Sequence, residues 1–116
     1  MDIGVMPRYI DIWKSAEEIA ARDHGSKGLL KHTGIDMPGM RSFLLSVRKG
    51  VTVAEHTVSP AITVQLLYGE ASVGTKEERY QLQESDVFAL EGGVPHDVKA
   101  AQDSVLLVTM GGDRGP

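Results

Sequence analysis

The stretch Ala61-Ile62-Thr63-Val64-Gln65-Leu66-Leu67-Tyr68-Gly69 carries the clearest structural signal in the chain. Apolar and β-branched residues follow one another here between a proline and a glycine, a pattern that indicates a β-strand. Because successive side chains of a strand point to opposite faces, alternate residues form two rows. We expect one row to face the core: Ile62, Val64 and Leu66.

Short runs of the same kind recur from Leu29 onward, at intervals of about 8 to 12 residues bounded by Gly, Pro, Asp or Ser. They predict strands at residues 42–48, 51–56, 61–68, 70–73, 79–82, 86–90, 96–100 and 104–110. The charged stretch that begins at Gly74 predicts a hairpin turn with a solvated tip. So many short strands in one small domain predict an all-β sandwich, barrel or jelly roll.

The N-terminal part of the chain has a different pattern. Ser15 and Glu18 fit a capping box, which predicts a short helix over residues 16–23 that ends near Gly25. We expect Trp13 to anchor this segment and His24 to lie on the surface at the helix end. With 116 residues the chain has room for one domain. The predicted organisation is an N-terminal extension (1–28), a barrel domain (29–110) and a flexible tail (111–116).

Composition excludes several functional classes. The chain has 12 Lys and Arg against 16 Asp and Glu, with the basic residues scattered, which argues against nucleic acid as a partner. With no Cys it has no disulfides, thiolate zinc sites or Cys nucleophile. The sequence has no run of 18 apolar residues, so it predicts no membrane-spanning helix. We therefore expect a soluble cytoplasmic protein.

Residues 50–69 resemble the first motif of the cupin superfamily, which has a Gly, five residues, a His-x-His pair, three or four residues, a Glu, six residues and a Gly. Three residues match that frame: Gly50, His56 and Gly69. Val58 stands at the second His of the motif, and Ile62 stands at the Glu.

Residues 85–100 resemble the second cupin motif, which has a Gly, five residues, Pro-x-Gly, two residues, His, three residues and Asn. Gly93 and His96 match it, and Pro95 precedes the His as it often does in the family. Ser85, Glu91 and Ala100 depart from it. Fifteen residues separate the two motifs, which is within the range of the family. The resemblance implies a cupin jelly-roll β-barrel.

In cupins, four side chains of these motifs hold a metal such as Fe, Mn, Ni or Zn. Here the resemblance leaves only His56 and His96 as metal ligands, because Val58 and Ile62 carry no lone pair to donate. Two imidazoles without a carboxylate make a weak site. The resemblance also implies a homodimer, and the outward row around Gln65 and Leu67 is a candidate face for a second subunit.

Three hypotheses therefore stay open, and the sequence does not decide whether the protein is an enzyme. The first is a small-molecule binding or sensing module with a largely apolar pocket. Its expected lining is His56, Val58, Ile62, Val64 and His96. The second is a metal-dependent enzyme of the oxygenase or isomerase type. In the third, the barrel is filled and both histidines are bonded to the backbone. We expect His32 at the surface, and Met37 and Met40 packed under a loop.

Overall fold

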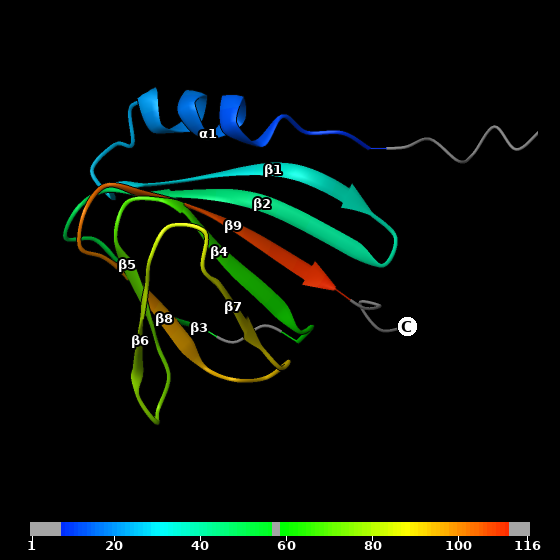
Figure 1. The fold of residues 1–116 in the computed structure, drawn as a ribbon, viewed down its shortest axis with the longest axis vertical. Helices are drawn as coiled ribbons and strands as arrows, with labels where there is room; N and C mark the ends of the chain where they lie inside the picture. The colour runs from blue at the N-terminus through cyan, green and yellow to red at the C-terminus, as the bar shows by residue number, and fades with distance from the viewer. Residues whose placement is uncertain (1–7, 57–58, 112–116) are drawn as a thin grey trace, which may run out of the picture.

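Two antiparallel sheets pack face to face (Figure 1). The buried hydrophobic side chains lie between them. The computed structural model describes residues 8–56 and 59–111. One sheet has the strand order β1-β2-β9-β4-β7, and the other has the order β3-β8-β5-β6. The strands are β1 (Leu29–Met37), β2 (Met40–Val47), β3 (Thr52–His56), β4 (Ile62–Tyr68), β5 (Ala71–Gly74), β6 (Arg79–Leu82), β7 (Val87–Leu90), β8 (His96–Ala100) and β9 (Ser104–Gly111).

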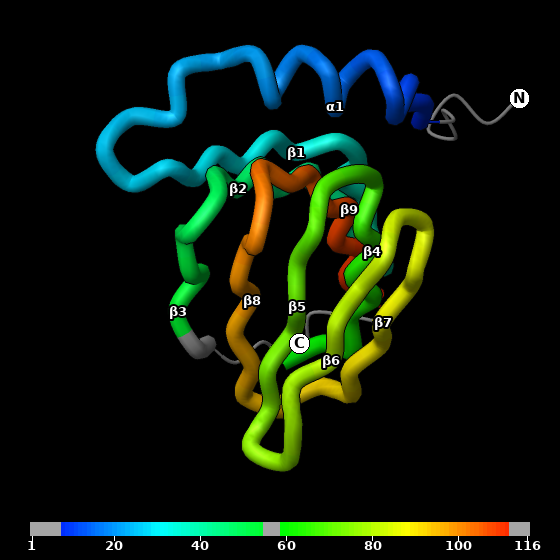
Figure 2. The backbone as a smooth tube through the Cα atoms, turned by 60° about the vertical axis from the view of Figure 1, so that its left-hand side comes forward, coloured from blue at the N-terminus to red at the C-terminus, as the bar shows by residue number. Residues whose placement is uncertain are grey.

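Five of the seven pairs of neighbouring strands are not consecutive in the sequence, as in a jelly roll. Strand β2 pairs with β9, and β3 pairs with β8 (Figure 2). The predicted all-β class and jelly-roll architecture are confirmed, and each of the eight predicted strands is present. The predicted turn after Gly74 is also present, with the Thr75 amide donating to the Glu78 carbonyl at 2.9 Å.

Strand β1 was not among the predicted strands. Polar residues and Gly34 interrupt its hydrophobic pattern, and its pairing with β2 shifts register between Thr33 and Ile35. The turn that joins the two strands was predicted as a loop covering two methionines. Instead Met40 begins β2 and is 45% exposed. Pairing with β2 therefore makes this segment a strand despite its weak local signal.

Helix α1 (Ile12–Ala21) begins four residues earlier than predicted. Asp11 is the N-cap, and its carboxylate accepts a hydrogen bond from the Lys14 amide at 3.1 Å. The predicted cap, Ser15, lies within the first turns of the helix. The helix ends at Ala21, two residues before the predicted end at position 23.

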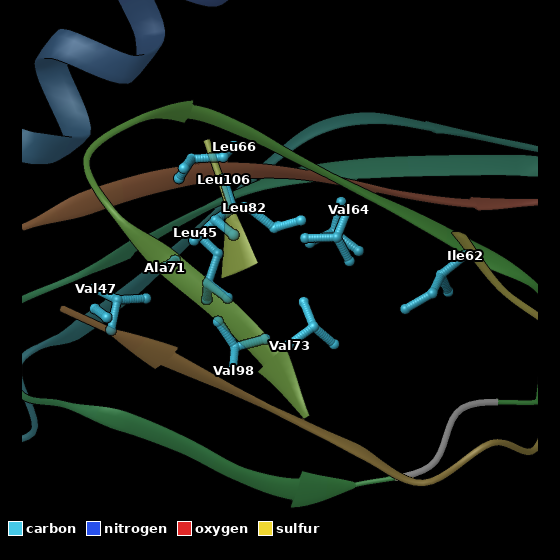
Figure 3. Close-up of a cluster of buried hydrophobic side chains, with 12 residues drawn as sticks. Leu45, Val47, Ile62, Val64, Leu66, Ala71, Val73, Leu82, Val98 and Leu106 are labelled. Atoms are coloured by element: carbon cyan, nitrogen blue, oxygen red, sulfur yellow. The ribbon is translucent and has the colours of Figure 1, made fainter. Parts of the chain in front are cut away.

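The alternation of side chains along β4 is as predicted. Ile62, Val64 and Leu66 are all buried between the sheets. Figure 3 shows Ile62 and Val64 pointing from their sheet toward Val73 and Val98 of the other sheet. The space between the two sheets is therefore bounded mainly by hydrocarbon.

Helix α1 covers part of the outer face of the larger sheet. Ala16 and Ile19 pack there against Leu44, Leu67 and Val105, all of them buried. Leu67 was expected on a face open to a second subunit, but the helix of the same chain covers it. Trp13, expected to be the anchor, is 57% exposed. Ala16 and Ile19, which are both about 1% exposed, make the contact instead.

His24 was predicted at the surface and is buried instead. Its Nδ1 lies 2.8 Å from the Arg22 carbonyl oxygen, so Nδ1 donates the proton. Its Nε2 lies 2.7 Å from the hydroxyl of Ser46, which is also buried. The Nδ1 bond thus fixes the ring within its own segment, and the Nε2 contact ties the segment after α1 to strand β2.

Candidate functional site

A cavity of about 300 Å³ lies between the two sheets. Eight of its ten lining side chains are hydrocarbon, and the other two are Lys31 and His96. The hydrocarbon lining consists of Leu29, Phe43, Leu45, Val53, Ile62, Val64, Val98 and Val108. These residues come from both sheets and are the inward-facing members of their strands, so the cavity is part of the jelly-roll interior.

His96 is the buried polar group of this cavity, with only 2% of its surface exposed. It begins strand β8, three residues after the turn at Gly92 and Gly93. Its Nδ1 lies 3.0 Å from the Val94 carbonyl oxygen, and because a carbonyl only accepts, Nδ1 must donate. This bond fixes the ring, and in the neutral imidazole it leaves the acceptor lone pair on Nε2.

Lys31 is the charged group of the cavity, and the sequence did not indicate it as a site residue. It lies on β1, the strand that was not predicted, and it is exposed to solvent while lining the cavity. Its Nζ sits 4.2 Å from the centroid of the Phe43 ring on β2. Such a cation–π contact stabilises an exposed lysine by about 0.5–1 kcal/mol. The contact holds the ammonium group at the mouth of the cavity.

The structure brings three of the predicted pocket residues together: Ile62, Val64 and His96. For His56 it describes the backbone, which pairs directly opposite His96 between β3 and β8. The His56 side chain and all of Val58 lie outside the described part of the chain. Leu66 continues the inward row but lies in the packed core beyond the cavity lining.

The described residues do not fit the metal site that the family resemblance implies. Ile62 stands where the motif has its Glu, and it lines the cavity with a side chain that has no lone pair. Among the described side chains, to which those of Glu55 and His56 do not belong, no three of His, Cys, Asp or Glu gather in one place. The Lys31 ammonium lines the same cavity and would repel a divalent cation. We therefore assign no chemical step to a metal.

The backbone keeps the geometry of both motifs even where the residue type has changed. Gly50, Gly69 and Gly93 have φ values of +84°, +102° and +84°. Ser85, at the position of the motif-two Gly, also has a positive φ, +79°. It occupies the third position of a β-turn closed by the Asp86 amide, which donates to the Gln83 carbonyl at 2.9 Å. That position favours glycine, so Ser85 adopts here a backbone conformation that suits glycine better.

A second hollow, of about 390 Å³, lies along β4, β7 and β9. Its lining is mostly small or apolar, and Glu91 is its only charged residue in the described part of the chain. Of the predicted pocket residues it contains only Ile62. The cavity between the sheets is therefore the better candidate site, because the buried His96 and the Lys31 ammonium converge there.

Among the described residues, no helix is both long and apolar enough to cross a membrane.

No protein-family model matches the sequence, and neither does any curated protein. Solved structures do match. A cupin superfamily protein from Desulfitobacterium hafniense aligns with a TM-score of 0.75 and 20% identity, over 84% of this chain and 87% of that one. KdgF from a Halomonas species aligns with a TM-score of 0.70 and 17% identity, over 80% of this chain and 87% of that one.

A variant of salicylate 1,2-dioxygenase from Pseudoaminobacter salicylatoxidans aligns with a TM-score of 0.72 and 19% identity, over 88% of this chain and 34% of the enzyme. At these identities the matches establish a shared fold. A shared fold does not determine function. The resemblance seen in the two sequence motifs is thus confirmed, and the protein has the fold of a small RmlC-like cupin.

Proposed function

We propose that this protein is a small-molecule binding or sensing module whose ligand site is the cavity between its two sheets. One observation carries the proposal: a cavity of about 300 Å³ with eight hydrocarbon side chains and two convergent polar ones, Lys31 and His96. Ligand sites in proteins have this makeup, with an apolar lining and a few polar groups that orient the ligand. A binding module needs this shape and no reactive centre.

The third hypothesis, a barrel filled by side chains, predicts no such space beside His96. An apolar cavity of about 150 Å³ is enough to hold benzene, so one of about 300 Å³ can take a small organic molecule. Other proteins of this fold do bind such molecules, since salicylate 1,2-dioxygenase is known in an adduct with gentisate. We assign His56 to the same site, on the support of its backbone pairing with His96.

A metal-dependent oxygenase or isomerase is the second candidate. The backbone pairing of His56 with His96 favours this candidate, because both are ligand positions of the motifs. Ile62 opposes it because it has no lone pair, and Lys31 opposes it because its charge repels a metal cation. Protein purified without an affinity tag should contain less than about a tenth of an equivalent of any transition metal if the binding proposal is right, because two imidazoles alone hold a metal weakly. Stoichiometric metal that His96→Ala removes would favour the enzyme.

A fragment screen followed by NMR or thermal shift tests the binding proposal. Hits should lose affinity in His96→Ala and in Val64→Phe, which places a larger side chain in the cavity. Two matched controls should leave the same hits bound. His32→Ala removes an imidazole that does not line the cavity, and Val87→Phe adds the same bulk at a position that is 59% exposed. Hits that bind all four variants equally would overturn the proposal.

A further inference from the structure

The charge at the cavity mouth has no counterion in the described structure. Arg48 pairs with Asp103 and Arg79 pairs with Asp97, and neither of these ion pairs involves Lys31. The interaction that positions the Lys31 ammonium is its contact with the Phe43 ring, 4.2 Å from Nζ to the centroid. An aromatic ring orients a cation without neutralising it.

Phe43 has a second role, because it also lines the cavity. The same ring therefore gives the cavity an apolar surface and holds the ammonium group beside that surface. Leu29 lies two residues before Lys31 on β1 and also lines the cavity, so the cation is bordered by hydrocarbon. A charge beside apolar surface is less screened than one surrounded by water, which strengthens its attraction for an anion.

We propose that the cavity takes an anionic ligand with an apolar body, a small carboxylic acid of about one ring in size, whose carboxylate pairs with Lys31. This inference rests on the proposed function and names the chemical class of its ligand. The hydrocarbon lining selects the body, and the cavity volume, about twice that of a cavity that holds benzene, limits its size. Lys31 selects the charge, since a cationic ligand of the same shape would be repelled.

Three probes of nearly equal shape separate these requirements: benzoate, benzyl alcohol and benzylamine, titrated by NMR at low salt. For the wild-type protein we expect benzoate to bind roughly five to ten times more tightly than benzyl alcohol, and benzylamine to bind least. Lys31→Met keeps the hydrocarbon stem and should make benzoate and benzyl alcohol equal. Lys31→Arg should keep the preference. Added salt should weaken benzoate binding in the wild type and leave it unchanged in Lys31→Met.

Lys99→Met is the matched control, because it removes the same charge from β8 at an exposed position next to the cavity-lining Val98. It should bind benzoate as the wild type does. Equal binding of benzoate and benzyl alcohol by the wild type, with both lost in Val64→Phe, would overturn the anionic class and leave the binding module standing. If Val64→Phe does not fold, Val53→Phe at the half-buried edge of the cavity replaces it. If none of the probes binds, the one-ring carboxylic acid is overturned, and the fragment screen alone decides on the binding module. If all probes bind regardless of these substitutions, both proposals are wrong.

Discussion

The buried His24 should stabilise the whole fold, although it lies outside the barrel. His24→Ala removes two hydrogen bonds, to the Arg22 carbonyl at 2.8 Å and to the Ser46 hydroxyl at 2.7 Å. Each bond contributes about 0.5–1.5 kcal/mol net, and a buried hydroxyl left without a partner costs about 1–3 kcal/mol. Because Ser46 is only 1% exposed, water cannot easily replace the imidazole. We expect His24→Ala to lower the free energy of unfolding by about 2–4 kcal/mol.

Urea denaturation followed by circular dichroism gives this value directly. A double-mutant cycle with Ser46→Ala isolates the side-chain contact, and the double variant should be more stable than the sum of the single effects predicts by at least about 0.5 kcal/mol. Glu18→Ala on the exposed face of α1 is the control and should change stability by less than about 0.5 kcal/mol. Two results would refute this account of how the N-terminal segment is held. One is a loss of less than about 0.5 kcal/mol in the free energy of unfolding of His24→Ala, and the other is strict additivity in the cycle.

Three further substitutions test the backbone and the helix contact. Ser85→Gly should stabilise the protein by about 0.5–1 kcal/mol in urea denaturation, because Ser85 holds a φ of +79°; a loss would show that this turn is not strained. Gly69→Ala should cost about 2–4 kcal/mol, since φ is +102° there and a Cβ would meet the Ser104 backbone at 2.7 Å; a change under about 1 kcal/mol would contradict that packing. Burial raises the pKa of the Tyr68 phenol above its usual value, and the Glu17 carboxylate raises it further, while Arg48 lowers it by less. The folded chain therefore holds this proton more tightly than the unfolded chain, so stability should fall as the pH rises above about 10, and Tyr68→Phe should make that fall shallower; equal slopes for both proteins would contradict it.

The strands were predictable because burial between two sheets imposes a strict alternation on the sequence. Ile62, Val64 and Leu66 keep it, and their burial follows. The motif spacing predicted that His96 faces the barrel interior, and His96 lines the cavity. In these places the local pattern and the tertiary structure agree, so the sequence alone was enough to predict which side chains face the interior.

Other features depend on contacts between distant residues. Ser46, the partner that buries His24, lies 22 positions away, and no local pattern relates the two. Strand β1 is made by pairing with β2, so a polar run with a central glycine becomes extended, and Lys31 reaches the cavity with it. The helix begins after the Asp11 cap and not after Ser15, which adds Ile12 to the apolar contact with the sheet.

The most direct test of the central claim is an NMR measurement of intermolecular nuclear Overhauser effects between bound benzoate and the methyl groups of the protein. If the cavity between the sheets is the ligand site, the ring protons of benzoate should contact the methyl groups of Ile62, Val64 and Val98, which line it. Contacts only with the outer face, for example with the methyl groups of Thr63 and Thr109, would place the ligand in the second hollow and contradict the account.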